Sequence, residues 1–224
     1  MKNAKKYVHP AARRFIAKLK KQHPAVFTEL NFETPFELLV ATILSAQCTD
    51  KRVNVVTATL FALYPNPQAL AVARSDELET HIRSTGFYRS KTRALIGMAA
   101  SLVEHHGGVV PRQMKELVKL PGVGRKTANV VLGHALGVPG LPVDRHVLRV
   151  ANRLNIATGT TPESVERQLC LAFPKSDWIK TSDLLIRHGR RICKPRPLCL
   201  ECSVASDCPS AESIPNSKPL KSKT

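Results

Sequence analysis

The sequence is short of acidic residues and contains no long apolar run, and each shortage excludes a class of protein. Only 17 Asp and Glu stand against 34 Lys and Arg among 224 residues, which gives a formal net charge of +17. A field of that sign attracts polyanions, and nucleic acid is favoured over a membrane surface or an acidic protein. The longest uncharged run, residues 127–143, contains a histidine, glycines and prolines and falls short of the ~20 apolar residues that span a bilayer. We therefore expect a nucleic-acid partner and no membrane association.

Glycine is also scarce, and no alternation of apolar and polar residues is long enough to predict a strand. The sequence has 11 glycines, whereas runs rich in Ala, Leu and Val recur at helical spacing. A chain of this length lies between one large domain and two small ones. The pattern predicts an all-α fold of about ten helices with short connections.

Helix limits are predicted from apolar spacing and from residues that start or stop helices. Thr34 before Pro35 is typical of an N-cap followed by proline in the first turn. The helix that follows is apolar around much of its circumference, so we expect it to be central. A turn is expected at residues 64–67, and Gly86 and Gly189 are expected to end helices. The expected helices are 10–22, 35–47, 49–62, 75–85, 90–106, 111–120, 125–136, 144–155, 161–173 and 176–188.

The two ends of the sequence bear on where the chain works and on how much of it folds. The first residues are basic but lack the apolar segment of a secretory signal, and they fit either a solvated helix face or a transit peptide. We expect the cytoplasm or nucleoid of a bacterium, or the nucleus or mitochondrion of a eukaryote. Residues 210–224, rich in Ser, Pro and Lys, are predicted to be disordered.

Residues 120–128 predict two helices joined by a very tight turn. Gly122 and Gly124 supply backbone angles that other residues resist, and they leave amide N–H groups bare beside a helix N-terminus. Such amides, at the positive end of a helix dipole, suit a phosphate. Arg125 and Lys126 occupy the first turn of the second helix, where each cation opposes the dipole by about 0.3–1 kcal/mol. This cost indicates an external anion or a task for an amine.

The residues alone leave two roles open for Arg125 and Lys126. In the first, both side chains only contact phosphate. In the second, Lys126 is a nucleophile, because a lysine at a helix N-terminus and partly removed from water is more readily a free amine. A free amine is the form that attacks a carbon electrophile and makes a Schiff base.

Six cysteines fall into two classes. Cys48 and Cys170 stand alone in apolar helical patterns, so we interpret them as small buried hydrophobes. The other four, in order, are Cys193, Cys199, Cys202 and Cys208. Their spacing, C-x5-C-x2-C-x5-C, fits a metal site better than a disulfide framework in a chain of this size. Four thiolates bind tetrahedral zinc or a [4Fe–4S] cluster, and the spacing leaves both open.

The hairpin segment is followed by residues 143–146, Val-Asp-Arg-His, and then by residues 193–208, which contain the four clustered cysteines and which we call the cysteine loop. This order of motifs resembles the endonuclease III family, which are bifunctional DNA glycosylases and abasic-site lyases of the helix-hairpin-helix superfamily. The resemblance covers nearly the whole chain, from residues 36–39 through residues 44–47 to Cys208. The cysteine loop combined with residues 122–126 is highly specific for that family.

The resemblance implies a fold, a cofactor and a partner. The fold is expected to be two α-helical domains flanking a DNA-binding cleft: a six-helix domain at 28–138, and a second domain made of 1–27 and 139–209. The four clustered cysteines are expected to hold a [4Fe–4S] cluster in preference to zinc. The expected partner is double-stranded DNA that contains damaged bases or abasic sites, bound by a monomer. By resemblance, the lesions are oxidised or ring-fragmented pyrimidines and abasic sites.

The resemblance also gives roles to individual side chains. Lys126 matches the family's Schiff-base lysine and Asp144 its catalytic aspartate, whereas the position of Asp144 by itself indicates a helix N-cap. Gln47 resembles the residue that fills the gap left by a flipped nucleotide. Phe87 matches the apolar wedge against the opposite strand, which is usually leucine. From the residues alone, Gln47 also fits an ordinary polar loop residue, and Phe87 a core aromatic.

Three departures from the family pattern bear on substrate range and rate more than on the class of reaction. The family commonly has six residues between the first two cysteines, whereas this chain has five, 194–198. They include Lys194 and Arg196, which fit either phosphate contacts or a solvated basic loop. Arg145 stands where the family often has threonine, in a position to pair with the neighbouring aspartate, grip a phosphate or obstruct the lesion pocket. Phe87 is bulkier than leucine, which bears on opposite-base preference.

Two other functions compete with this interpretation. A mismatch-specific adenine glycosylase of the same superfamily lacks the nucleophilic lysine, so Lys126 counts against it. The absence of the usual catalytic glutamate of that group after Leu38 counts against it as well. A non-catalytic DNA-binding protein would keep the hairpin and the cluster without turnover.

Overall fold

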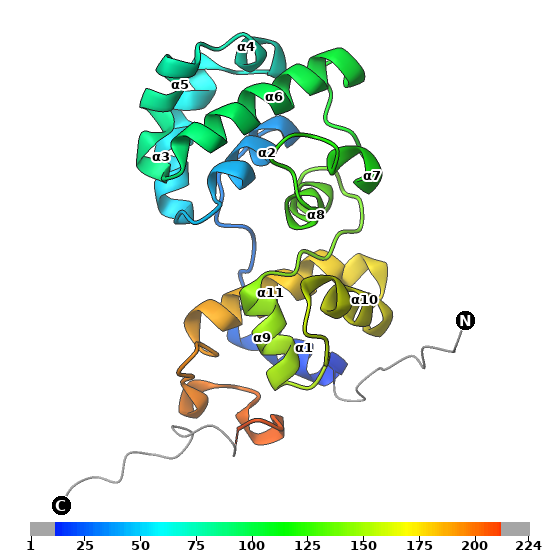
Figure 1. Cartoon of the computed structure of the whole chain (residues 1–224). Coiled ribbons are helices and arrows are strands. Elements are labelled where there is room, and N and C mark those ends of the chain that lie inside the picture. Colours follow the sequence, from blue (N-terminus) through cyan, green and yellow to red (C-terminus); the bar gives the residue numbers. More distant parts are fainter. Residues whose placement is uncertain (1–11, 212–224) are drawn as a thin grey trace, which may run out of the picture. The chain divides into compact units, whose positions relative to one another are not determined.

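A computed structural model describes residues 12–211, and every regular element among them is an α-helix or a 3-10 helix (Figure 1). The predicted all-α fold is thereby confirmed. None of the helices described is long and apolar enough to cross a membrane. The disorder predicted for residues 210–224 concerns a segment that lies, from residue 212 on, outside the described residues, as do the basic residues before residue 12.

The chain divides into two compact units. Thr28–Gly140 contains the predicted hairpin, and we call it the hairpin unit. Met1–Phe27 and Leu141–Thr224 together form the second, which contains the clustered cysteines and which we call the cysteine unit. Each unit buries a hydrophobic core of its own, as separate domains do.

The hairpin unit is built around one apolar helix, α2 (Pro35–Leu44). Thr34 caps it by accepting a hydrogen bond from the Glu37 backbone N–H (3.2 Å), and the Glu37 carboxylate accepts one from the Thr34 N–H (3.4 Å). Eight of the ten residues of α2 are buried, which confirms its predicted central position. The other helices of this unit are α3 (Asp50–Leu63), α4 (Pro67–Ala71), α5 (Ser75–Ile82), η1 (Arg83–Thr85), α6 (Tyr88–His106), α7 (Met114–Leu117) and α8 (Arg125–His134).

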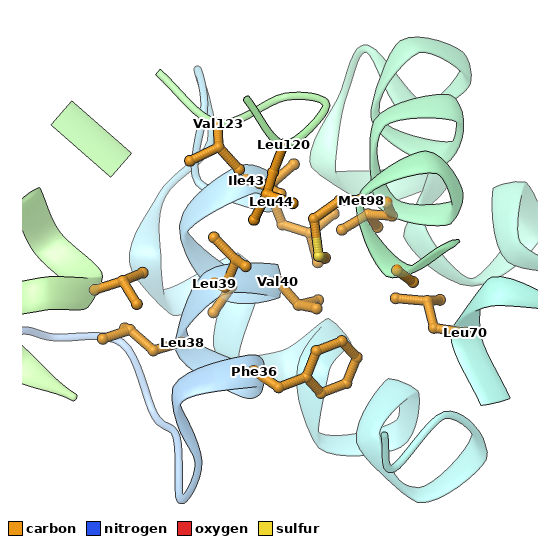
Figure 2. Close-up of a cluster of buried hydrophobic side chains, with 14 of the residues drawn as sticks. Phe36, Leu38, Leu39, Val40, Ile43, Leu44, Leu70, Met98, Leu120 and Val123 are labelled. Atoms are coloured by element: carbon orange, nitrogen blue, oxygen red, sulfur yellow. The ribbon is translucent and has the colours of Figure 1, made fainter. Parts of the chain in front are cut away.

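The core of the hairpin unit gathers side chains from helices on several sides of α2. Figure 2 shows Met98 of α6 and Leu70 of α4 in the same cluster as the α2 side chains. Leu120 and Val123, which flank the hairpin turn, lie beside Ile43 at the end of α2. Burying one such aliphatic side chain contributes roughly 1.5–3 kcal/mol. The hairpin turn is therefore anchored directly on the central helix.

The cysteine unit is built on the contact between α9 (Arg145–Arg153) and α11 (Trp178–Arg191). Gly189 lies inside α11, where the prediction had it ending the helix, and a Cβ there would lie 2.9 Å from the Cβ of His146 on α9. Glycine is present because α9 and α11 meet closely at this point. The prediction that Gly189 ends the helix was wrong. The remaining elements are α1 (Ala12–Gln22), α10 (Pro162–Ala172), η2 (Lys175–Asp177), η3 (Cys199–Glu201) and η4 (Ala205–Asp207).

Two helix limits in the hairpin unit differ from the prediction at places that matter for function. α2 ends at Leu44, not at residue 47. The Ala46 N–H donates to the Ile43 carbonyl oxygen (3.4 Å), three residues back instead of four, and Gln47 then adopts a left-handed backbone with φ of +55°. α6 begins at Tyr88, two residues before the predicted start. Ser90, the expected first residue, lies inside the first turn, where its hydroxyl donates to the Phe87 carbonyl oxygen (2.9 Å).

Two other predicted segments differ from the structure for local reasons. The turn expected at residues 64–67 is present at residues 64–66, but it leads at once into α4, a helix that the prediction missed. This helix forms because the Asn66 side chain accepts a hydrogen bond from the Ala69 N–H (2.9 Å) and Pro67 suits the first helical position. The helix expected at 111–120 is reduced to α7, because the last of these residues belongs to the hairpin turn.

Candidate functional site

The hairpin turn needs glycine at position 122 for two independent reasons. The Val123 N–H donates to the Leu120 carbonyl oxygen (3.1 Å), closing a turn with Pro121 and Gly122 at its centre. Gly122 has φ of +76°, a backbone angle that favours glycine. A Cβ there would also lie 2.7 Å from the Cβ of Ala94 on α6. The predicted need for a special backbone angle is confirmed at this residue.

Gly124 does not share that need, and the prediction for it was wrong. Its φ of −87° and ψ of 173° are extended backbone that any residue adopts, and the space that a Cβ would occupy is open. As the N-cap of α8 it places no side chain over the N–H groups of the first turn, and no side chain caps this end. Gly124 therefore leaves the positive end of α8 open to an approaching anion.

The first turn of α8 presents two cations at the surface. The helix begins at Arg125, as predicted, and Arg125 and Lys126 are both exposed, with no acidic residue in the turn. The opposite face of the helix is fixed in the core by Ala128 and Val131, which are fully buried. The Lys126 amine therefore extends from a rigid support. The expected partial removal of this side chain from water is not found in the protein alone.

Gln47 and Phe87 lie in the same unit as the hairpin and share an unusual backbone. Both are exposed, Phe87 by 63%, and both have positive φ (+55° and +50°). Among the described residues only one other non-glycine residue, Asn155, has positive φ. Such conformations cost energy and are found preferentially at binding and catalytic sites. The exposure of Phe87 argues against the alternative that it is a core aromatic.

Asp144 lies in the cysteine unit and caps α9, as its position in the sequence indicated. Its Oδ1 accepts hydrogen bonds from the backbone N–H groups of His146 (2.7 Å) and Val147 (2.8 Å). The carboxylate is therefore held in one orientation by the helix it starts. Lys126 and Asp144 belong to different units: Lys126 lies in the first turn of α8, and Asp144 is the N-cap of α9.

The other predicted DNA contacts are exposed residues of the cysteine unit. Arg145 is the first residue of α9, and Lys194 and Arg196 lie on the loop between the first two clustered cysteines. Their exposure is compatible with phosphate contacts and equally with a solvated basic surface. Their role stays a prediction.

The four clustered cysteines line a single cavity, together with apolar side chains that include Leu154, Ile192 and Val204. In the part of the chain that the structure describes, no three His, Cys, Asp or Glu side chains are placed to hold one metal ion. Cys48 and Cys170 are half-buried rather than buried as predicted, and each packs against the core of its own unit. Position 48 lies in the turn beyond the end of α2, which explains its partial exposure.

Electrostatics around the cavity favour a bound cation. Burial raises the pKa of the Cys202 thiol to about 11, and neighbouring cysteines add to the effect. Burial, followed by neighbouring cysteines, also raises the pKa of Cys208 and of Cys199. Four thiolates that line one cavity repel one another and need positive charge between them, which a metal centre supplies. The donor set therefore fits a thiolate-bound metal cluster.

Sequence reasoning missed two arginines of α9 that support the cysteine loop. Arg153 donates to the carbonyl oxygens of Lys194 (2.6 Å) and Pro195 (3.0 Å) and to the Cys193 sulfur (3.4 Å). Arg149 donates to the Cys193 carbonyl oxygen (3.1 Å). Their spacing of four residues along one helix is the only sequence signal they leave, and it is also typical of an exposed helix face.

Sequence reasoning also missed His188, which is 1% exposed beside the cavity. One ring nitrogen lies 3.5 Å from the Cys202 sulfur, and the other lies 3.2 Å from Nε2 of His23. Burial, with the nearby His23, lowers the pKa of His188 to about 4. A neutral imidazole in this place orients the sulfur without adding charge.

Comparison with known proteins identifies relatives over almost the entire chain. Residues 40–175 match the family model described as HhH-GPD superfamily base excision DNA repair protein. Endonuclease III of Synechocystis sp. is 50% identical over 196 residues, which cover 87% of this chain and 90% of that protein.

Two solved structures resemble this fold closely. A non-covalent Endonuclease III–DNA complex has a TM-score of 0.86 and 42% identity, and the match covers 90% of this chain and 95% of that one. A trapped covalent Endonuclease III–DNA intermediate, an estranged-adenine complex, gives the same values.

Proposed function

This chain belongs to the HhH-GPD superfamily of base excision DNA repair proteins, and we propose that it removes oxidised pyrimidines from duplex DNA and cuts the strand with the Lys126 amine. It is a base excision repair glycosylase and lyase of the endonuclease III type. The observation that carries the residue assignment is the position of Lys126, an exposed residue in the first turn of α8, where no side chain caps the helix. The likeness to an Endonuclease III trapped covalently on DNA supports it, since such a complex requires a nucleophile.

Binding begins at the phosphate backbone. The open N-terminus of α8, with Gly122 and Gly124 at its approach and Arg125 beside it, suits a phosphate of the damaged strand. Lys194 and Arg196 would contact further phosphates, and Arg145 would do so next to Asp144. Contacts of this kind position the duplex without reading its sequence.

Recognition then requires the damaged nucleotide to leave the base stack. Gln47 would fill the gap and Phe87 would press against the opposite strand. Unstacking costs less at a damaged or poorly paired base, which is one source of selectivity. The phenyl ring fills more space than the leucine usual at this place, so opposite-base preference is where this chain would differ from its relatives.

The chemistry proceeds through a Schiff base. The Lys126 nitrogen donates its lone pair to the sugar C1′, the bond from C1′ to the base breaks, and the base leaves with the electron pair and takes up a proton. A proton then passes from the lysine nitrogen to the ring oxygen as the bond from C1′ to that oxygen breaks, which opens the ring and gives an iminium between the nitrogen and C1′. Loss of a proton from C2′ then expels the 3′ phosphate by cleavage of the C3′–O bond. Water hydrolyses the remaining iminium and releases the amine.

Asp144 would stabilise positive charge on the sugar or accept a proton, and this can be separated from its capping role. Asparagine caps a helix as well as aspartate does, so Asp144→Asn should change stability by less than about 0.5 kcal/mol. The same variant should lower the rate of base excision by roughly a hundredfold, because it removes the charge. Chemical denaturation and single-turnover excision measure the two effects.

Alanine at the same position provides the comparison. Asp144→Ala should lose about 1 kcal/mol of stability in addition to the activity, because both hydrogen bonds to the backbone are lost. Full activity in Asp144→Asn would leave Asp144 with a capping role only.

We propose that the four cysteines of the cavity hold a [4Fe–4S] cluster. The four cysteines that line one cavity support this proposal, and so does the similarity to Endonuclease III. When bound, such a cluster supplies positive charge that holds four thiolates together. Arg153 and Arg149 would then fix the loop of residues 194–196 relative to α9, the helix that Asp144 caps.

A cleavage panel with the wild-type protein tests the proposed function. Labelled duplexes would carry an oxidised pyrimidine, uracil, a plain abasic site or no lesion. We expect strand cleavage by β-elimination at the oxidised pyrimidine and at the abasic site, and none at uracil or undamaged DNA. Base release without strand cleavage would contradict the lyase mechanism, and preferential attack on uracil would contradict the proposed substrate class. Sedimentation of the protein is expected to give a monomer.

A further inference from the structure

Lys91 is a buried lysine in the hairpin unit that neither the sequence motifs nor the proposed chemistry uses. It lies in the first turn of α6 and is only 5% exposed. Its amine donates one hydrogen bond to the Leu44 carbonyl oxygen (2.8 Å) and one to the Thr85 carbonyl oxygen (2.8 Å). The two acceptors are 47 and 6 residues away along the chain, so the amine joins segments that the sequence separates.

Keeping an ammonium group in this place is costly. Burial lowers the pKa of the Lys91 amine, and the nearby Cys48 offsets this only in part. A side chain needed only to fill space would be apolar, because a buried charge must recover its lost hydration from the groups around it. The retained amine therefore indicates that its two hydrogen bonds matter.

Each acceptor stands two or three residues before an exposed residue with a left-handed backbone. Leu44 is the last residue of α2, and the chain then turns through Gln47. Thr85 ends η1 and is followed by Gly86 and then Phe87. We call residues 45–48 the plug loop and residues 85–87 the wedge loop.

The position of the amine also suits the end of α2. The last carbonyl groups of a helix lack partners within the helix and carry the negative end of its dipole. A cation that binds the Leu44 carbonyl oxygen satisfies one of these groups and fixes the direction in which the chain leaves the helix. The bond to Thr85 then transmits this position to the wedge loop.

We propose that Lys91 is a positioning residue that ties the plug loop and the wedge loop together, so that Gln47 and Phe87 enter the duplex in a fixed relation. This inference rests on the proposed function, since it assumes that both side chains meet DNA. Lys91 itself does not touch the substrate. Loops that lose their tie would place the two side chains less accurately, and an error of about 1 Å costs up to a hundredfold in rate.

The test compares a lesion inside a duplex with one that needs no plug or wedge. Lys91→Met keeps the length of the side chain and removes the amine. We expect it to lower single-turnover cleavage of an abasic site in duplex DNA by about tenfold to a hundredfold. Cleavage of the same abasic strand without its complement should fall by less than about threefold, because no opposite strand has to be held apart.

Thr92→Val is the matched control. Thr92 is the next residue of α6, it is 1% exposed, and its hydroxyl has no hydrogen-bond partner. This variant changes a buried polar group in the same turn without removing a hydrogen bond to either loop, so the ratio of duplex to single-strand cleavage should stay at the wild-type value. An equal loss on both substrates in Lys91→Met would show general damage to the fold and would overturn the proposal.

Combined variants test whether Lys91 acts through the two side chains. In a background that already carries Gln47→Ala and Phe87→Ala, Lys91→Met should cost less than about twofold on duplex DNA. A full, additive loss in that background would overturn the inference. If Lys91→Met does not fold, Lys91→Gln is carried through the same comparisons with the same expected losses, because its side chain is one bond shorter and lacks the charge.

A second measurement remains valid if the wild-type protein cleaves neither substrate, which would be a failure of the proposed function itself. Amide hydrogen exchange should then still be faster at residues 45–48 and 85–87 in Lys91→Met than in Thr92→Val. Unchanged exchange in both loops would show that Lys91 does not hold them.

Discussion

Lys126→Gln is expected to form no borohydride-trapped adduct with DNA that contains an abasic site, whereas the wild-type protein should form one. Borohydride reduces the iminium between the amine and the sugar C1′ to a stable bond, so trapping requires a lysine nitrogen at the reacting carbon. Strand cleavage should fall at least about a thousandfold, which corresponds to about 4 kcal/mol of transition-state stabilisation. Gel analysis of the reduced complex and single-turnover cleavage measure both effects.

Arg125→Gln is the control for the alternative that both cations only contact phosphate. Arg125 lies in the same helical turn as Lys126, is also exposed and is likewise a basic residue. Its removal should weaken DNA binding, yet the adduct should still form when the protein is in excess over DNA. An adduct that persists in Lys126→Gln, or that disappears equally in both variants, would refute the assignment of Lys126 as nucleophile.

Cys202→Ser is expected to lose the metal centre and most of the stability of the cysteine unit. In the wild-type protein a [4Fe–4S] cluster should give a brown colour and broad visible absorbance, with iron and not zinc in elemental analysis. Metal binding contributes to folding free energy, so its loss should lower the free energy of unfolding by several kcal/mol. The cavity offers few other contacts to replace it, since its remaining walls are largely apolar.

The two cysteines outside the cavity provide the matched controls. Cys170→Ser and Cys48→Ser should keep the absorbance and the iron, and each should cost about 1 kcal/mol, as an ordinary half-buried substitution does. Stoichiometric zinc in the wild-type protein would refute the iron–sulfur cluster in favour of a tetrahedral ion. Equal iron in Cys202→Ser and Cys170→Ser would refute the ligand set.

Features that depend on neighbours within one turn of chain could be predicted from the sequence. Thr34 caps α2, Asp144 caps α9 and Gly122 occupies the hairpin turn, in each case because the partner atoms lie two to four residues away. The order of the hairpin, the aspartate and the cysteine loop was sufficient to predict the family that the comparisons then showed.

Features that depend on a partner far along the chain could not be predicted in this way. Gly189 resembled a helix terminator, but a contact with His146 explains it, more than forty residues away. Arg153 resembled part of a charged helix face, but it donates to the Lys194 carbonyl oxygen in the cysteine loop. In both cases the local pattern matches a common surface role, and only packing identifies the partner.

The sequence by itself therefore determined the class of fold, the family and the residues that the proposed chemistry uses, because motifs of a few residues carry that information. The tertiary structure decided how those residues are supported. It made Lys126 an exposed residue of the first turn of α8, and it gave Gln47 and Phe87 left-handed backbones. It also buried Lys91 between the segments that lead to them. The physical reason is that a hydrogen bond or a close approach depends on distance in space, which residue order does not specify.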